Sequence, residues 1–481
     1  MTTTSENHII DQLGMFGSIP DWLAAPMQPE RVIASLLRNV PELSEGRLQL
    51  LRCSADRLRA KGTEWLARYS LTVAQPDGEV RDVVLVGNLW GPLAETPAAT
   101  SVDGMPFGES GWASYLPDLR LTLRAQANDE ALPALPTLVD PESAAQLLRP
   151  VLHAAGYREA AIAACEPVVV RYKPGSRCTV VVRLSYLDAN ASKRPPSPIV
   201  VKTHQGDKGE VAWAAMNALW QRPHSWLGVV QLAEPLAYLP DDRILVQGPI
   251  PEEQTLKELA RDAIASMDAT MLARLRDGLT NTARGLAAIH GSGASYGRTA
   301  TFEDELAEVR EVLDRLSLSV PGLPQAAAPL LRLLTSRSRL AKADPIVSAH
   351  HDFRPAQVLL HGGGVGFIDF DGACMAEPAL DLGRFRAKLR DIGIFALDGD
   401  AEPCSESSVE ENLALLDDLC EHFLAAYQQY APVSRTRVLI WEACDLLTTM
   451  LHAWTKVRLA RLEPRLTTLT HQLSVSGLCE D

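Results

Sequence analysis

Three aspartates and one glutamine lie in a short polar segment, HHDFRPAQVLLHGGGVGFIDFDG, which covers residues 350–372. Asp352 and Gln357 come before the apolar run VLL, and the glycines of GGGVG then predict a tight turn. Asp369 and Asp371 follow the returning run GFI, so the order predicts a hairpin with polar groups at its open end. Clusters of oxygen ligands of this kind suit Mg²⁺, which binds few carboxylates and retains waters or phosphate oxygens. The alternative is a hairpin whose polar ends only face solvent.

This segment resembles a known family. HHDFRPAQ at 350–357 resembles the catalytic loop H-G-D-x-x-x-x-N of the aminoglycoside phosphotransferase and small-molecule kinase family, and also the protein-kinase form H-R-D-x-x-x-x-N. IDF at 368–370 resembles the family's I-D-F/W metal motif, and EPALDL at 377–382 resembles its G-D-P-x-x-D-L-A segment. The resemblance covers the chain from about residue 141 to its last residue.

The resemblance implies a role for each polar group. Asp352 is expected to be the catalytic residue that accepts the proton of a substrate hydroxyl, and Asp369 and Gln357 are expected to hold Mg²⁺ against the phosphates of ATP. Two positions depart from the pattern, since His351 replaces a glycine and Gln357 replaces an asparagine. Glutamine keeps the amide oxygen and adds one methylene, so it can still bind a metal. Maltokinase-like members of the superfamily also look like H-G-D-x-x-x-x-Q.

The strand-rich stretch before this segment is similar to the family's nucleotide-binding lobe. Lys202, at the end of PIVVKT, resembles the strand lysine that binds the α- and β-phosphates. Glu210, on the predicted helix KGEVAWAAMNALW, is the nearest candidate for its ion-pair partner. ILVQGPIPEEQTL resembles the hinge, where Gln247 would contact the adenine. RYKPGSRCTVVV resembles the hairpin that covers the phosphates, but Gly175 is its single glycine. Three side chains of this hairpin are candidate donors instead: Lys173, Ser176 and Arg177.

Two long helical patterns end the chain, at about 408–430 and 434–470. They are expected to form the wall that selects the acceptor, and four of their residues are candidate lining groups: Trp441, Glu442, Asp445 and Trp454. The alternative is that this aromatic stripe belongs to the core. His350 and Asp381 are expected to brace the catalytic loop through hydrogen bonds.

An internal repeat organises the first half of the chain. Pro29 and Pro141 each open an apolar helical pattern, and the separation of 112 residues recurs between Arg59 and Arg171. The stretches YLPDLRLTL and YLPDDRILV also match, at a separation of 123 residues. Insertions in loops account for the larger offset. The aligned strands place Gly87 opposite Lys202, so the first copy lacks the lysine. Two unrelated strand-rich stretches with chance matches are the alternative.

Composition narrows the function classes. The 481 residues include 46 Lys and Arg against 60 Asp and Glu, for a net charge of −14, which disfavours non-specific binding to nucleic acid. The eight cysteines are scattered without a C-x-x-C pair, which favours free thiols in a reducing compartment. The N-terminus lacks the pattern of a signal peptide, and no apolar run reaches the length of a membrane helix. We expect a cytoplasmic protein that does not bind membranes.

Other chemistries fit less well. GASYG at 293–297 matches G-x-S-x-G, but it follows a helical pattern, whereas the nucleophile of a serine hydrolase must follow a strand. Adjacent histidines without H-E-x-x-H argue against a zinc enzyme. The remaining alternative is a non-catalytic pseudokinase, which binds nucleotide or acts as a scaffold.

We therefore predict an α+β, protein-kinase-like two-lobe fold with a small antiparallel β-sheet lobe and a mostly helical lobe, preceded by an extra lobe of the first type. The expected domains are an N-terminal tail (1–28), a divergent repeat of the nucleotide lobe (29–135), the nucleotide lobe (136–250) and the helical lobe (251–481). The expected reaction is ATP- and Mg²⁺-dependent phosphorylation of a hydroxyl on a small metabolite, such as a sugar, an amino sugar or an aminoglycoside-like compound.

Overall fold

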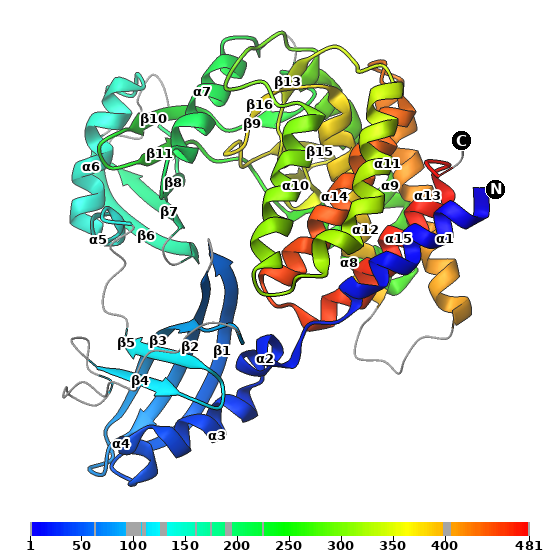
Figure 1. Ribbon diagram of the computed structural model, residues 1–481. Coiled ribbons are helices and arrows are strands. Elements are labelled where there is room, and N and C mark those ends of the chain that lie inside the picture. The colour runs from blue at the N-terminus through cyan, green and yellow to red at the C-terminus, as the bar shows by residue number, and fades with distance from the viewer. Residues whose placement is uncertain are drawn as a thin grey trace. The chain divides into compact units, whose positions relative to one another are not determined.

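The computed structural model describes residues 2–61, 64–92, 107, 112–125, 132–158, 161–173, 176–187, 195–223, 226–397 and 406–479 (Figure 1). The chain forms two compact units. The first unit contains Met1–Asn128, Glu305–Thr335 and Leu446–Asp481, and the second contains Asp129–Asp304 and Ser336–Asp445.

A five-stranded antiparallel sheet begins the second unit, with strand order β10-β11-β8-β7-β6 among the described residues. The runs VVVRY, TVVVRLSY and IVV supply the β-branched residues that pack well on a pleated surface. Alternate side chains such as Val180, Val182 and Val201 face one side and form a core with helix α6. The bounds are α5 (Leu135–Val139), α6 (Pro141–Ala154), β6 (Ile162–Lys173), β7 (Arg177–Tyr186), β8 (Ile199–His204), α7 (Lys208–Trp220), β10 (Pro235–Leu239) and β11 (Ile244–Gln247).

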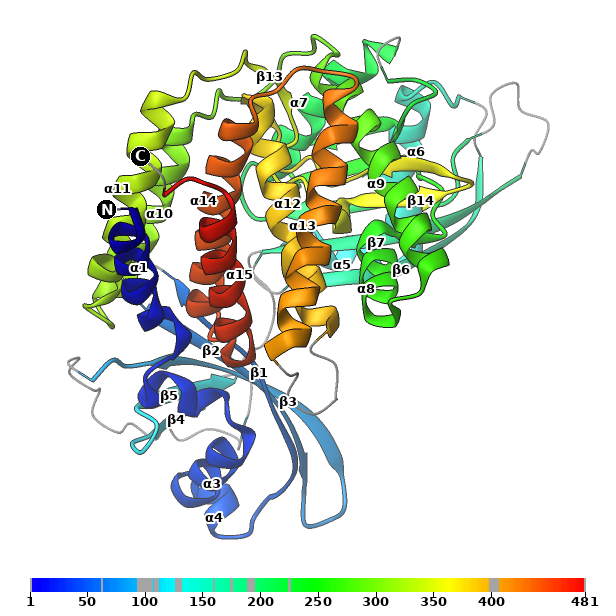
Figure 2. The same cartoon turned by 90° about the vertical axis from the view of Figure 1, so that its right-hand side faces the viewer.

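The rest of the second unit is mostly helical and carries a small hairpin. Helices α8, α9, α12 and α13 pack against one another, and α12 and α13 run side by side in Figure 2. The hairpin of β14 and β15 turns at Gly362 and Gly363, whose positive φ angles suit glycine. The bounds are β9 (Gln231–Leu232), β12 (Gln254–Thr255), α8 (Leu256–Ser266), α9 (Ala269–His290), β13 (Val347–Ala349), η4 (Pro355–Gln357), β14 (Val358–His361), β15 (Gly364–Phe367), β16 (Cys374–Ala376), α12 (Pro378–Leu397), α13 (Glu406–Gln428) and α14 (Arg435–Thr455).

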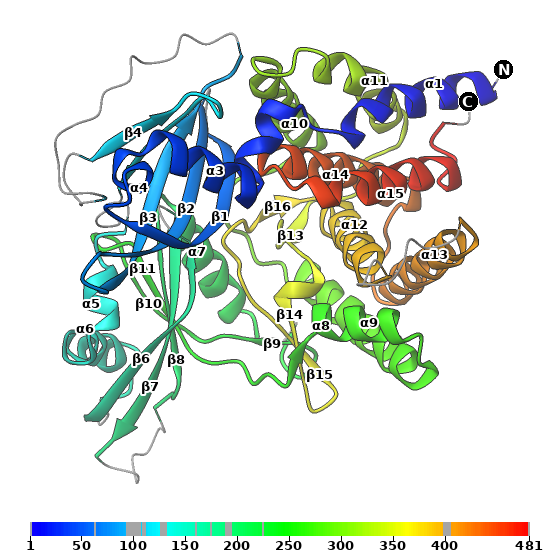
Figure 3. The same cartoon turned by 90° about the horizontal axis from the view of Figure 1, so that it is seen from below.

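The first unit contains a second antiparallel sheet, in the order β1-β2-β3-β5-β4 among the described residues, and helix α3 lies across one of its faces (Figure 3). The bounds are α1 (Thr2–Leu13), η1 (Gly14–Gly17), α2 (Asp21–Ala24), η2 (Ala25–Met27), α3 (Pro29–Asn39), α4 (Pro41–Ser44), β1 (Gln49–Lys61), β2 (Glu64–Ala74), β3 (Val80–Leu89), β4 (Ala113–Leu116), β5 (Leu121–Ala125), η5 (Leu459–Arg461) and α15 (Leu462–Val475). Helices α10 (Phe302–Ser317), α11 (Leu323–Leu340) and α14 cross the boundary between the two units.

The two sheets have the same topology. In each, a helix that begins with proline precedes three consecutive antiparallel strands, and a hairpin then adds its second strand next to the third strand of the sheet. The two hairpins turn through PDLR and PDDR, and the arginine that ends each turn, Arg120 or Arg243, has a positive φ. Gly87 pairs with Ala67 as Lys202 pairs with Thr179, and residues 67 and 179 are again 112 apart. These correspondences support the predicted internal repeat.

The missing lysine of the first copy has a steric cause. A Cβ atom at Gly87 would lie 2.4 Å from the backbone oxygen of Thr122 and 2.7 Å from a methyl group of Leu123. Real side-chain atoms do not approach that closely, so β3 and β5 leave no space for a side chain at this position. The first sheet therefore does not offer a lysine equivalent to Lys202.

The N-terminal segment differs from the expected tail. Residues 2–27 form short helices in place of a loosely packed lead-in, and Leu13 and Phe16 are completely buried. The indole nitrogen of Trp454 donates a hydrogen bond to the backbone oxygen of Phe16 at 3.0 Å. These contacts involve residues more than 400 positions away, so the local sequence pattern does not reveal them.

The predicted α+β fold class is confirmed, with small antiparallel sheets and a helical part. The expected domain boundaries stay a prediction, and the compact units divide the helical part differently, because 305–335 and 446–481 group with the N-terminal residues. None of the described helices is long and apolar enough to cross a membrane. The described cysteines are free thiols, and Cys404 lies outside the described residues.

Candidate functional site

The loop at 350–357, which resembles a catalytic loop, connects β13 to β14, and one carboxylate accepts hydrogen bonds from its backbone. Asp381, in the first turn of α12, accepts hydrogen bonds from the backbone nitrogens of His350 (2.7 Å) and His351 (2.8 Å). Its Oδ2 also lies 3.1 Å from Nε2 of His290. Burial raises the pKa of Asp381, but the hydrogen bond and charge of His290 outweigh it, so the pKa stays below its ordinary value. Asp381 therefore braces the loop.

Asp352 lies on the outer side of this loop. Its side chain is 43% exposed and forms an ion pair with the guanidinium of Arg354 at 3.1 Å. The preceding residue, His351, has a φ of +68°. That conformation favours the glycine that the family pattern has here, so histidine is held in a strained backbone position. A guanidinium nitrogen of Arg384 donates to the backbone oxygen of His351. These contacts fix the direction in which Asp352 leaves the loop.

Asp369 lies at the centre of the site, immediately after strand β15. It is buried, and its φ of +73° is another positive value for a non-glycine residue. Nζ of Lys202 lies 2.9 Å from its Oδ1, and Nε2 of Gln357 donates to its Oδ2 at 2.9 Å. Arg177 approaches to 3.4 Å. Burial raises the pKa of Asp369, but the charges of Lys202 and Arg177 hold the pKa well below its usual range, so the group is a carboxylate.

Asp371 forms the second acidic position. Its Oδ2 lies 2.9 Å from Nε2 of His204 and 3.1 Å from a guanidinium nitrogen of Arg177. Its Oδ1 is buried and has no hydrogen-bond partner among the described residues; the nearest cation is Lys202, at 3.9 Å. A buried carboxylate oxygen without a hydrogen bond is unfavourable unless a cation or donor reaches it. This oxygen is thus a candidate ligand for a cation.

The donor set fits Mg²⁺. Two carboxylates, Asp369 and Asp371, lie within reach of the same lysine, and Mg²⁺ typically uses one or two carboxylates and completes its shell with water and phosphate oxygens. Gln357 turns its amide nitrogen, and not its oxygen, towards Asp369. To act as a metal ligand it would have to rotate its amide by half a turn.

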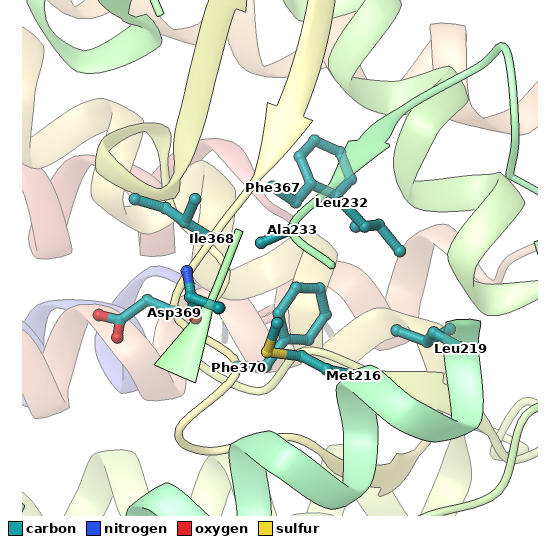
Figure 4. Close-up of a pocket in the computed structure, with 9 residues that line it drawn as sticks. Met216, Leu219, Leu232, Ala233, Phe367, Ile368, Asp369 and Phe370 are labelled. Carbon is teal, nitrogen blue, oxygen red and sulfur yellow. The ribbon is translucent and has the colours of Figure 1, made fainter. Parts of the chain in front are cut away.

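The predicted nucleotide residues separate into two groups. Gln247 is buried and lines a small pocket together with Asp369, Phe367 and Phe370. In Figure 4, Met216, Phe367 and Phe370 gather around this pocket while the Asp369 carboxylate points away from it. The wall of this pocket is mostly apolar, and Gln247 contributes a polar side chain to it.

Glu210 does not meet Lys202. It is exposed in the first turn of α7, and the described partners of Lys202 are Asp369 and Asp371. The expected ion pair between residues 202 and 210 is therefore absent from the described structure, because Lys202 contacts the two aspartates that follow β15 instead. Glu210 instead acts electrostatically on Tyr238.

The candidate acceptor-lining residues are occupied elsewhere. Glu442 is fully buried and binds both Arg386 (2.7 Å) and Arg390 (2.6 Å), which lie on α12. The indole nitrogen of Trp441 donates to Glu377 at 2.6 Å. Asp445 and Trp454 are also buried. The alternative interpretation, a buried core stripe, is the correct one for these four residues.

Sequence reasoning missed His204 and Arg171. His204 follows Lys202 by two positions on β8, so it faces the same side of the sheet, and this period of two was the available signal. Arg171 pairs in register with Thr179, which itself pairs with Lys202. Gly175, the single glycine of the predicted phosphate hairpin, lies outside the described residues.

The structure contradicts the serine-hydrolase alternative. Ser295 lies in the connection between α9, which ends at His290, and α10, so no strand precedes it. A nucleophile elbow requires a strand before the serine and a helix directly after it.

Residues 225–433 match the model of the Phosphotransferase enzyme family. No curated protein matches the chain. Among solved structures, a glucosamine kinase in complex with glucosamine, ADP and inorganic phosphate is 18% identical, with a TM-score of 0.45 over 95% of this chain and 99% of that one. A choline/ethanolamine kinase family protein from Mesorhizobium loti is 17% identical, with a TM-score of 0.41 over 70% of this chain and 95% of that one.

A choline kinase from Cryptosporidium parvum Iowa II is 14% identical, with a TM-score of 0.44 over 69% of this chain and 94% of that one. These similarities do not identify a substrate for this chain. Asp352, Gln357 and Asp369 lie within the matched range. Residues 225–433 thus match the phosphotransferase enzyme family, and both the predicted family resemblance and the predicted kinase class are confirmed.

Proposed function

We propose that the protein is an ATP- and Mg²⁺-dependent phosphotransferase that acts on a hydroxyl group of a small metabolite, with a sugar, amino sugar or aminoglycoside-like compound as the acceptor class. The observation that carries the proposal is the meeting of Lys202 with Asp369, 167 residues later, and of Asp369 with Gln357. A lysine, two carboxylates and an amide in one buried place are the parts that phosphoryl transfer requires for positioning and for neutralising charge.

Each residue has a defined task in this proposal. Lys202 binds α- and β-phosphate oxygens of ATP and gives up its contact with Asp369 as it does so. Asp369 and Asp371, with Gln357 after rotation of its amide, hold Mg²⁺, which when bound neutralises phosphate charge. Gln247 contacts the base from the pocket of Figure 4.

Asp352 acts on the acceptor. The acceptor oxygen forms a bond to the γ-phosphorus, the bond from that phosphorus to the β,γ-bridging oxygen breaks, and ADP leaves with the bonding electrons. The hydroxyl proton passes to the Asp352 carboxylate, a type of assistance typically worth about 10² to 10⁴-fold in rate. The partial exposure of Asp352 leaves one side of the group open to an acceptor.

The test is a screen of hydroxyl-bearing metabolites by ATP consumption, with Asp369→Ala as the blank. Activity with one acceptor class that Asp352→Asn lowers by at least about 100-fold, while ATP still raises the melting temperature, supports the proposal. Stabilisation by Mg-ATP without turnover of any acceptor would favour the pseudokinase alternative. Phosphorylation that is unchanged in Asp352→Asn would show that the catalytic assignment is wrong.

A further inference from the structure

Basic side chains dominate one face of the second unit's sheet, at the end nearest the acidic residues. Strands β6, β7 and β8 lie side by side there (Figure 3). Residues paired in register across antiparallel strands share a face, as do residues two apart on one strand. Two adjacent rows of the ladder therefore present five basic groups and one threonine on the same face: Lys173, Arg177 and His204 in one row, and Arg171, Thr179 and Lys202 in the next.

This arrangement attracts anions. Like charges directly opposite each other on neighbouring strands destabilise a sheet, and Lys173 lies opposite Arg177. Arg171 has no hydrogen-bond or ion-pair partner among the described residues. Its pKa is lowered by burial first and by the charge of Arg177 second. Arg171 and Lys173 are exposed, so their side chains are open to an anion from solution.

The nearby acids do not balance these charges. Arg171, Arg177, Lys202 and Arg354 carry four positive charges, whereas three aspartates, at 352, 369 and 371, supply three negative ones. A bound Mg²⁺ would add two further positive charges to the site. A triphosphate carries about four negative charges, so it is the kind of ligand that closes the balance.

Arg177 occupies the position nearest the turn of the hairpin. It begins β7 and precedes Thr179, the residue level with Lys202, by two positions, which is about 7 Å along a strand. Its guanidinium reaches both acids, at 3.1 Å from Asp371 and 3.4 Å from Asp369. If Lys202 contacts the α- and β-phosphates, Arg177 lies one step further out, towards the terminal phosphate.

We propose that Arg177 binds the terminal phosphate groups of the nucleotide and is a further catalytic residue of the phosphotransferase. The inference rests on the proposed function. In protein kinases the backbone of a glycine-rich loop covers the phosphates, and this hairpin, with its single glycine, uses a side chain for that task. A guanidinium suits it because its planar set of N–H donors binds phosphate in a bidentate manner. Without nucleotide, Arg177 forms ion pairs with Asp369 and Asp371. When nucleotide binds, contacts with phosphate oxygens replace these ion pairs.

The test compares three ligands that differ in phosphate number. ATP, ADP and AMP are titrated by calorimetry, with and without Mg²⁺, into the full-length wild type and into Arg177→Gln, Arg177→Lys and Arg183→Gln. Arg183 is the matched control, because it lies on the same strand and is exposed. We expect Arg177→Gln to weaken ATP binding by about 10- to 100-fold, to weaken ADP binding less and to leave AMP within about twofold. Arg177→Lys should recover part of the loss, and Arg183→Gln should match the wild type.

Three other outcomes would each refute a specific claim, either the role of Arg177 or the proposed function. Equal affinities of the wild type and Arg177→Gln for ATP and ADP would refute the role of Arg177 while leaving the phosphotransferase intact. An equal loss for ATP, ADP and AMP would also refute it, because that pattern shows a structural effect on the whole lobe. A folded wild type that binds none of the three nucleotides would instead refute the proposed function itself.

Discussion

Replacing Asp381 by asparagine should loosen the loop that carries Asp352. The carboxylate now accepts the backbone N–H groups of His350 and His351 on separate oxygens, at 2.7 Å and 2.8 Å. Asparagine has the same shape but only one acceptor oxygen, and its NH₂ group would face the second N–H. The substitution therefore leaves at least one buried backbone donor unsatisfied and removes the charge that strengthens both bonds.

The expected loss can be worked from these contacts. An unsatisfied buried donor costs about 1–3 kcal/mol, and the change from a charged to a neutral acceptor weakens the remaining bond by about 1 kcal/mol. We therefore expect a loss of about 2–4 kcal/mol in the stability of the second unit. Because displacement of a reacting group by about 1 Å can cost about 100-fold in rate, kcat should fall by about 10- to 100-fold while the KM for ATP changes little.

Hydrogen exchange of the His350 and His351 amides is the most direct measurement, since the two compact units need not unfold together. Both amides should exchange faster in Asp381→Asn than in the wild type. Asp262→Asn is a suitable control, because Asp262 is exposed on α8 and its described partner is the adjacent Arg261. Wild-type exchange rates and an unchanged denaturation midpoint in Asp381→Asn would refute the bracing role.

Three further predictions use other strained or buried positions. His351→Gly should change the free energy of unfolding by less than about 1 kcal/mol, because relief of the positive φ offsets the added chain entropy, whereas His351→Val should lose at least about 1 kcal/mol more in chemical denaturation. Gly383→Ala should lower the melting temperature by several degrees, because its Cβ would lie 2.6 Å from the backbone nitrogen of Glu442; an unchanged melting temperature would contradict this packing. Burial raises the pKa of Asp445, but Lys388 and a neighbouring guanidinium lower it by a larger amount, so the pKa in the folded state is below the pKa in the unfolded state. Its contribution is present above about pH 4 and is lost as the pH falls, so Asp445→Asn should flatten urea stability between about pH 5 and pH 3, and an equal slope would count against the ion pairs.

The local pattern of the chain predicts the site motifs and their order. The spacing of Asp352, Gln357 and Asp369 around an apolar hairpin is a local property, since each lies at the end of a short run whose turn is set by glycines. The strand that delivers Lys202 is likewise set by its β-branched residues. The repeated topology of the two sheets follows in the same way, because a shared order of strands and turn residues is written along the chain.

The pairing of charges was decided by the tertiary structure. Glu210 is eight residues from Lys202, yet the lysine meets Asp369, and the burial of Phe16 depends on Trp454 far along the chain. Local periodicity tells which face a side chain takes, because backbone geometry repeats every two or 3.6 residues. It does not tell which distant face lies opposite, since that depends on how whole elements pack and on which buried charges find the closest counter-charge. For this reason the motifs could be predicted from the chain, whereas the cluster of Arg177, Lys202 and His204 with Asp369 and Asp371 required the folded structure.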